Sequence, residues 1–104
     1  KELIRRFLPD GTEVGAVPIT FQLNRYWKTR LLHDRNSGAV YAVFARNLRT
    51  WLREVDVRTG QLGPERVLDD PFPEQVRVHG DHAYFIYRPA GSLQHRTLYR
   101  QRIR

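Results

Sequence analysis

The segment HGDH carries the residue types best suited to metal or acid–base chemistry in this chain. Its histidines, His79 and His82, flank Gly80 and Asp81, and imidazole and carboxylate groups are common metal ligands and proton carriers. Gly80 and Asp81 are also typical of a tight turn, and in a strand that continues from this turn His82 would point away from Ala83. We therefore interpret HGDH as a turn and predict neither a metal site nor a general base there.

Three carboxylates near residue 70 raise the question of a cation site. Asp69, Asp70 and Glu74 carry oxygen ligands of the kind that a hard cation accepts. The prolines at positions 71 and 73 instead favour an ordinary polar crossover between two strands. We therefore predict no metal ion and no cofactor.

The sequence contains no motif for nucleophilic catalysis. Ser37 and Ser92 lie in predicted turns without a GxSxG elbow, and there is no P-loop or GxGxxG sequence. His33 and Asp34 adjoin the turn NSG and are interpreted as part of it. The absence of Cys excludes a disulfide, a thiolate metal site and a cysteine nucleophile. We predict no catalytic residue and expect that the chain is not an enzyme.

The formal net charge is +7, and arginine supplies nearly all of the positive charge because only Lys1 and Lys28 are lysines. Such an excess raises nucleic acid, an anionic glycan or a membrane surface as partners. The arginines are scattered along the chain, mostly beside apolar residues, whereas a polyanion-binding stripe would cluster them. The pattern predicts solvated strand faces and disfavours nucleic acid. No apolar run approaches the roughly 18 residues that a membrane-spanning helix needs.

Glycine-containing turns divide the chain at short and fairly even intervals. The segments between them are too short for ordinary helices and are rich in β-branched and aromatic residues, which favours strands. The predicted turns are PDG (9–11), NSG (36–38), RTG (58–60), HGD (79–81) and PAGS (89–92). The sequence therefore predicts an all-β fold. We expect a single domain with a modest hydrophobic core, because 104 residues suffice for one domain.

Two kinds of longer strand can be distinguished. AVYAVFA (39–45) and HAYFIY (82–87) are nearly continuous apolar runs, which predicts central strands covered on both faces. LREVDV (52–57) and LYRQRI (98–103) mix apolar and charged positions, which predicts strands nearer an edge with one side in water.

The order of strands repeats, with a period of roughly 43 to 49 residues that lies within the range of four-stranded propeller blades. Each copy has a short strand, 29–32 or 74–78, before the buried strand. The matching positions are Tyr41 with Tyr84, Leu52 with Leu98, Val57 with Ile103, and the segment 3–19 with 52–68. If the strands of a blade are named A to D, residues 1–20 form strands C and D, 29–68 form a complete blade, and 74–104 form strands A, B and C of a last blade.

The segments LREVDVRTG, PEQVRVHGDHAYFIYR and LYRQRI resemble the last blades of bacterial six-bladed β-propellers, broadly similar to the NHL and YWTD groups. The chain has no YWTD tetrapeptide and no WD or kelch signature. The resemblance implies antiparallel four-stranded, blade-like sheets, a binding role and an extracytoplasmic location, which is periplasmic or at the cell surface. It carries over no catalytic residue.

About two blades cannot close a ring, so apolar sheet faces would be left uncovered. We expect a C-terminal fragment of a larger propeller, in which the remaining blades of the parent chain cover these faces. One alternative is self-association into a composite ring or stacked sheets. Another is a two-sheet β-sandwich made from the same nine strands.

The resemblance also implies a ligand face, formed in propellers by the D-to-A and B-to-C connections. In this chain these connections are 21–28, 46–50, 69–74 and 88–94. The predicted binding residues are Arg25, Tyr26, Trp27, Lys28, Arg46, Arg49 and Arg88. Their rings and cationic groups suit a glycan, carboxylate or phosphate ligand. The alternative is that Tyr26 and Trp27 cap the core, with the arginines merely solvated.

Three classes of function remain open. The first, which we favour, is a non-catalytic binding or interaction module that is part of a β-propeller. The second is the accessory propeller portion of an enzyme whose catalytic residues lie elsewhere. The third is an Arg-rich β domain that binds a polyanion such as nucleic acid, although rings within buried strands do not give the exposed stacking pattern of single-strand binders.

Overall fold

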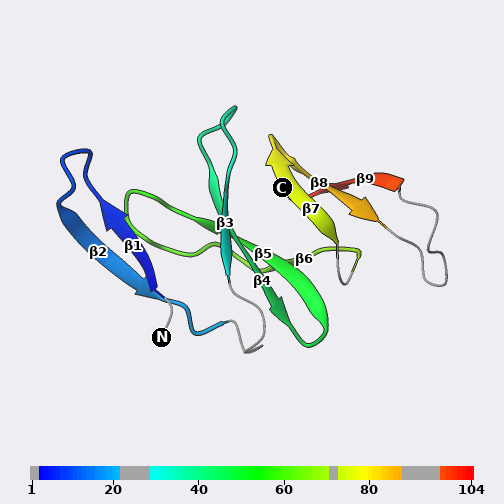
Figure 1. Cartoon of the computed structure of the whole chain (residues 1–104), viewed down its shortest axis with the longest axis horizontal. Coiled ribbons are helices and arrows are strands. Elements are labelled where there is room, and N and C mark those ends of the chain that lie inside the picture. The colour runs from blue at the N-terminus through cyan, green and yellow to red at the C-terminus, as the bar shows by residue number, and fades with distance from the viewer. Residues whose placement is uncertain (1–2, 22–28, 71–72, 88–96) are drawn as a thin grey trace.

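The computed structural model describes residues 3–21, 29–70, 73–87 and 97–104 of the chain. These residues form nine strands joined by turns, and no helix lies among them (Figure 1). The all-β prediction is therefore confirmed. The same ranges hold no helix with the length and apolar character needed to cross a membrane.

The strands form three small antiparallel sheets. Sheet I has two strands, β1 (Leu3–Phe7) and β2 (Glu13–Pro18). Sheet II has four, in the order β3 (Arg30–His33), β4 (Val40–Arg46), β5 (Arg49–Val55) and β6 (Arg66–Val67). Sheet III has three, in the order β7 (Glu74–His79), β8 (His82–Tyr87) and β9 (Thr97–Arg102). Each strand therefore pairs with the strand that follows it in its sheet.

The sheets lie side by side with sheet II in the middle, along a molecule whose longest axis spans 48 Å (Figure 1). Successive side chains of β4 alternate between the two faces of sheet II. Tyr41 and Val43 enter a core shared with sheet III, whereas Ala42 and Phe44 enter a second core shared with sheet I. Sheet II is therefore covered on both faces by its neighbours.

The burial of β4 confirms the prediction that both of its faces are covered, because all five residues from Tyr41 to Ala45 are buried. The same prediction for β8 is wrong. Ala83 and Phe85 are buried, but Tyr84 and Ile86 on the opposite face are only half-buried. No described sheet covers that face.

Turn chemistry sets the strand boundaries. Gly11, Gly38, Gly60 and Gly80 all have positive φ, which confirms four of the predicted turns. The fifth, PAGS, lies outside the described residues. The hairpin between β4 and β5 was not predicted as a tight turn, because its central residues are Asn47 and Leu48, with φ of 54° and 59°. Glycine would be expected there instead of leucine.

The pairing registers test the matches expected between sheets II and III. Tyr41 pairs with Glu54 and Val43 with Leu52, while Tyr84 pairs with Arg100 and Ile86 with Leu98. The matched residues Tyr41 and Tyr84, and Leu52 and Leu98, therefore occupy the same places in their ladders. The matching of Val57 with Ile103 is wrong in burial, because Val57 is 55% exposed and Ile103 is 5% exposed.

The match of Leu3 with Leu52 is also wrong, by one residue. Leu3 is 45% exposed, whereas Ile4 is buried like Leu52. The cause is the turn after β1, where the Gly11 amide donates to Leu8 O three residues back, while in the turn after β5 the Gly60 amide donates to Asp56 O four residues back. A one-residue change in turn length moves every side chain of a strand to the other face.

Asp34 joins sheets II and III through hydrogen bonds. Its buried carboxylate accepts from the Ser37 hydroxyl at 2.6 Å and the Asn36 amide at 3.0 Å within its own turn. It also accepts from the Gly80 amide, in the turn between β7 and β8, at 2.8 Å. The Ser37 hydroxyl is the main cause that lowers the pKa of Asp34 below its ordinary value of 3.8. From the sequence, Asp34 was expected to serve only its own turn.

Candidate functional site

Only two of the predicted ligand residues lie in the described part of the chain. Arg25, Tyr26, Trp27, Lys28 and Arg88 lie outside the described residues. Arg46 and Arg49 pair with each other across the β4–β5 hairpin, and both residues therefore lie at the same end of sheet II. Ligand binding by the full set stays a prediction.

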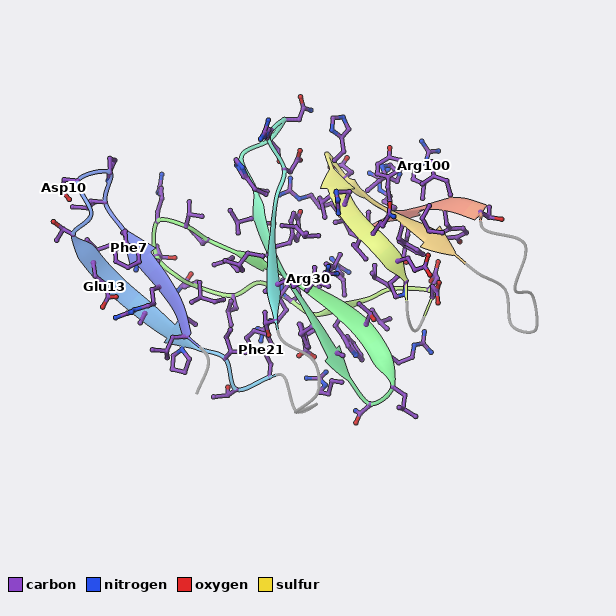
Figure 2. All side chains as sticks on the ribbon, in the orientation of Figure 1. Phe7, Asp10, Glu13, Phe21, Arg30 and Arg100 are labelled. Atoms are coloured by element: carbon purple, nitrogen blue, oxygen red, sulfur yellow. The ribbon has the colours of Figure 1, made fainter. Side chains whose placement is uncertain are left out.

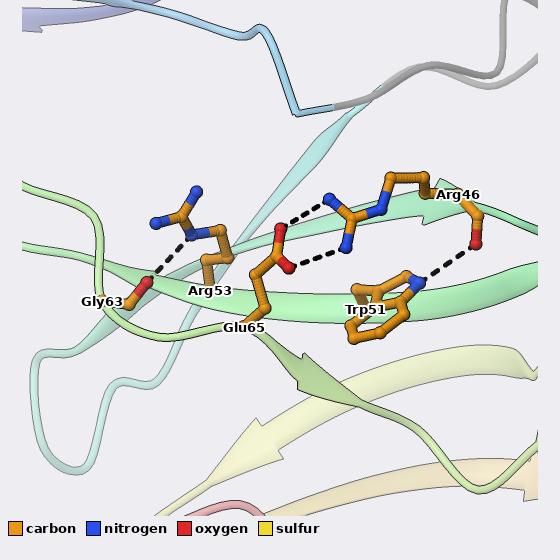
Figure 3. A network of polar contacts seen from close by, with 5 residues as sticks. All are labelled: Arg46, Trp51, Arg53, Gly63 and Glu65. Carbon is orange, nitrogen blue, oxygen red and sulfur yellow. Dashed lines mark hydrogen bonds and ion pairs between the residues drawn. The ribbon is translucent and has the colours of Figure 1, made fainter.

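Arg46 already holds a carboxylate. Its Nη1 and Nη2 groups each donate at 2.7 Å to one oxygen of Glu65, and the guanidinium lies 4.8 Å from the centre of the Trp51 ring (Figure 3). The Trp51 Nε1 group donates to Arg46 O at 3.0 Å. The hydrogen bonds between the two side chains raise the pKa of Arg46 and lower the pKa of Glu65. An anionic ligand would have to compete with Glu65 for this guanidinium.

A second arginine also covers aromatic core. The Arg53 Nε group donates to Gly63 O at 2.9 Å (Figure 3). Its guanidinium lies 5.3 Å from the centre of the Phe21 ring. Phe21 in turn meets Phe44 edge to face, with ring centres 4.6 Å apart. Arg46 and Arg53 thus close the core between sheets I and II by stacking on its rings.

Arg49 marks the junction of two predicted ligand-face segments. Its Nη2 group donates to Leu68 O at 3.4 Å, and the Leu68 amide donates to Thr50 O at 2.9 Å. These contacts place the β4–β5 hairpin beside the start of the connection 69–74. Of the four segments expected on one face, these two adjoin.

A cavity of about 200 Å³ opens at this connection, and the described residues that line it are Asp69, Asp70, Phe85 and Tyr99. The Tyr99 hydroxyl donates to Asp69 Oδ2 at 3.1 Å, and the Phe85 and Tyr99 rings are 5.4 Å apart at 41°. Asp70 is only 7% exposed. The cavity therefore combines carboxylate acceptors with an aromatic wall.

Gln101 on β9 holds Asp69 in place. Its Oε1 accepts from the Asp69 amide at 2.8 Å, and its Nε2 donates to Val67 O at 2.9 Å. One side-chain amide thus bonds to the backbone on either side of Leu68, much as a neighbouring strand would. This clamp fixes the edge of the cavity against sheet III.

Tyr99 was not among the residues predicted to bind, and Asp69 and Asp70 were interpreted only as a polar crossover. Tyr99 belongs to LYRQRI, a segment predicted to be partly solvated. Residues that oppose each other in a ladder share a face of the sheet, and Tyr99 pairs with the buried Phe85. The alternation of side chains along this strand could therefore have indicated that Tyr99 faces the core side of sheet III.

A second cavity, of about 480 Å³, lies at the other end of sheet II. Its walls include the turn between β3 and β4, the end of β5 and Arg104. Arg104 Nη2 donates to Glu54 Oε1 at 3.0 Å across this cavity wall. None of the predicted ligand residues lines it.

The described residues contain no group of three or more His, Cys, Asp or Glu side chains arranged to hold a metal ion. In the HGDH segment, His79 and His82 pair across the turn Gly80–Asp81, as the turn interpretation predicts. His79 Nδ1 is 4.0 Å from Asp34 Oδ1, so its nearest carboxylate already has other donors.

Comparison with protein-family models, with curated proteins and with solved structures found no match to this chain. The assignment of a function therefore depends on the sheets and cavities themselves.

Proposed function

We propose that this chain is a non-catalytic binding module built from blade-like sheets of a β-propeller, and that it takes a glycan at the cavity formed by Asp69, Asp70, Phe85 and Tyr99. The observation that carries the proposal is this cavity's combination of carboxylates and rings. The cavity opens at Asp69 and Asp70, which begin the connection 69–74 that the sequence predicts to be part of a ligand face.

The packing of sheet II supports the propeller part of the proposal. Its two faces border two separate cores, one with sheet I and one with sheet III. A two-sheet sandwich has one core between two layers, whereas stacked blades place a covered sheet between two others. The four antiparallel strands of sheet II in sequential order also match a blade.

The polar groups around the cavity favour a glycan over an anion. Asp69 and Asp70 are acceptors that suit sugar hydroxyls, and the Tyr99 ring offers a surface on which a sugar ring can stack. Two carboxylates would repel a ligand carboxylate or phosphate. Arg49 donates to Leu68 O, next to Asp69 in the sequence, while Arg46 is held by Glu65.

The proposal can be tested by titrating the chain with neutral and acidic hexasaccharides and monitoring the backbone amide resonances by NMR. We expect a neutral hexasaccharide to shift the amides of residues 69–70 and 97–101. Asp69→Asn should weaken binding about tenfold, because one charged hydrogen bond contributes roughly 1.5 kcal/mol. Arg58→Gln, in the turn at the other end of sheet II, is the matched control and should bind normally.

The glycan assignment would be rejected by saturable binding of the acidic but not the neutral sugars, or by normal binding of the neutral sugar to Asp69→Asn. Release of new reducing ends from a bound sugar would reject the non-catalytic assignment. If neither sugar class binds at millimolar concentration, the cavity is not a glycan site.

A further inference from the structure

The outer face of sheet III, on the side away from sheet II, is uncovered by the described residues. It includes Glu74, Arg77, Tyr84, Ile86, Leu98 and Arg100, because Tyr84 pairs with both Arg77 and Arg100, and Ile86 pairs with both Glu74 and Leu98. Leu98 is 70% exposed, and Tyr84 and Ile86 are half-buried. Arginines thus flank Tyr84 on the central strand of this face, and Glu74 and Leu98 flank Ile86.

The apolar residues of this face repeat those of a covered face. On the side of sheet II that packs against sheet III, Tyr41, Val43 and Leu52 have relative exposures of 4%, 5% and 0%. Tyr84 and Leu98 hold the same ladder positions as Tyr41 and Leu52, and Ile86 holds that of Val43. The outer face of sheet III therefore repeats the apolar positions of β4 and β5 on a face that receives another sheet.

Sheet I, at the opposite end of the chain, has a second face that no described sheet covers. The outer face of sheet I consists of Leu3, Arg5, Phe7, Glu13 and Ala16, because Phe7 pairs with Glu13 and Arg5 with Ala16. Leu3 and Phe7 are 45% and 56% exposed. Figure 2 shows Phe7 and Glu13 at one end of the molecule and Arg100 at the other.

The two internal interfaces have the same polarity. Sheet I turns Ile4 toward the face of sheet II that holds Phe44, and sheet II turns Tyr41 and Val43 toward the face of sheet III that holds Phe85. Each sheet thus receives the next one in the same direction along the chain. A further contact of this polarity joins sheet III of one chain to sheet I of another.

Charge argues for the same pairing. An isologous contact between two copies of the outer face of sheet III would bring two arginines and one glutamate from each copy together, an excess of positive charge that is unfavourable. The outer face of sheet I is balanced, because Arg5 Nε lies 2.6 Å from Glu13 Oε1. It presents a carboxylate beside apolar side chains, which suits a face with flanking arginines.

We propose that a second copy of this chain covers the outer face of sheet III with the outer face of its sheet I, in a head-to-tail contact. The proposal rests on the stacking of the sheets, as the blade part of the proposed function does, and is independent of glycan binding. The glycan titration involves other residues, so either proposal can fail alone. A head-to-tail contact builds rings or open chains, depending on the rotation between copies.

Sedimentation velocity of the full chain at rising concentration tests the contact. We expect a mass that rises above the 12.3 kDa of one chain. Leu98→Asp, which changes the outer face of sheet III, and Phe7→Asp, which changes that of sheet I, should each remain monomeric. Because each variant keeps the face that the other has lost, a mixture of the two should form a dimer and stop there.

The matched control is Leu48→Asp, at a side chain 75% exposed on the β4–β5 hairpin, which should associate like the unaltered chain. Circular dichroism checks that each variant is folded, and Leu3→Asp replaces Phe7→Asp if that variant is not. The proposal is overturned if the chain stays monomeric at 1 mM, which is roughly the effective concentration of two modules joined by a short linker. A mixture that stays monomeric, or a single variant that still associates, also overturns it.

Discussion

Strands β4 and β8 are each the second strand of their sheet, yet the structure surrounds them differently. β4 (Val40–Arg46) lies between two cores, and every residue from Tyr41 to Ala45 is buried. β8 (His82–Tyr87) has one core, and Tyr84 and Ile86 face away from it. Both sequences are apolar along their length. The difference shows that the burial of a strand depends on which sheets stack beside it, a property that its own residues permit but do not impose.

The largest expected change in the free energy of unfolding comes from placing a charge at matched positions of β4 and β8. Val43→Asp should lower the free energy of unfolding by about 4 kcal/mol or more, because it puts an unpaired carboxylate into the core between sheets II and III. Ile86→Asp, at the same ladder position in sheet III, should lower it by about 1 kcal/mol or less. Urea denaturation at micromolar protein concentration measures both.

Equal losses in the two variants would mean that the outer face of sheet III is covered in the isolated chain. The comparison between β4 and β8 would then be wrong. Val43→Thr and Ile86→Thr provide a milder matched pair if Val43→Asp does not fold.

The positions of the strands were predictable because they depend on local chemistry. Gly11, Gly38, Gly60 and Gly80 fix four turns through positive φ, and the β-rich segments between them leave little other choice. The connection between β4 and β5 was predicted at 46–50, but its tight turn was not, because its second central residue is Leu48, whose left-handed conformation carries no sequence signature.

The candidate site was less predictable, because its contacts join residues far apart in sequence. Arg46 was predicted to bind a ligand, but Glu65 holds its guanidinium from nineteen positions away. Tyr99 reaches Asp69 from thirty positions away. No periodic pattern links either pair, since each contact depends on how a turn or connection folds back over a sheet.

A smaller effect concerns the hydrogen bonds between sheets II and III. Asp34→Asn should lower the Tm by roughly 4–8 °C, the shift expected when a domain of this size loses one well-made buried contact. Both oxygens of Asp34 accept backbone or hydroxyl donors, so an asparagine must turn its NH₂ group toward one of them. Asp56→Asn is the control, because the exposed carboxylate of Asp56 accepts from Arg58 and Thr59 within its own turn and does not join two sheets. Thermal unfolding followed by circular dichroism measures both.

The stabilisation by Asp34 should depend on pH in a definite direction. The folded pKa of Asp34 is lowered from 3.8, so its contribution to stability is fully present above that value. The contribution is lost as pH falls through the folded pKa. The Tm difference between the unaltered chain and Asp34→Asn should therefore shrink as the pH falls below 3.8. A difference that stays constant with pH would show that the charge of Asp34 does not matter.

The smallest effect compares an ion pair on a covered face with one on an uncovered face. The Arg46–Glu65 side chains are 20% and 29% exposed, whereas those of Arg5 and Glu13 are 60% and 40% exposed. Glu65→Gln should lower the free energy of unfolding by about 0.5–1 kcal/mol, and Glu13→Gln by about 0.3 kcal/mol or less, because solvent screens the more exposed pair. Urea denaturation at low salt measures both differences.

The pKa of Glu65 is lowered from 4.5 by its hydrogen bonds to Arg46, so the stabilisation by this pair is present above that value and is lost as pH falls through the folded pKa. The effect of Glu65→Gln should accordingly shrink as the pH falls below 4.5, while at neutral pH it should persist in about 0.5 M salt better than that of Glu13→Gln. Equal changes in the free energy of unfolding for the two variants at every salt concentration would mean that the aromatic core beneath Arg46 does not reduce the solvent screening of its ion pair.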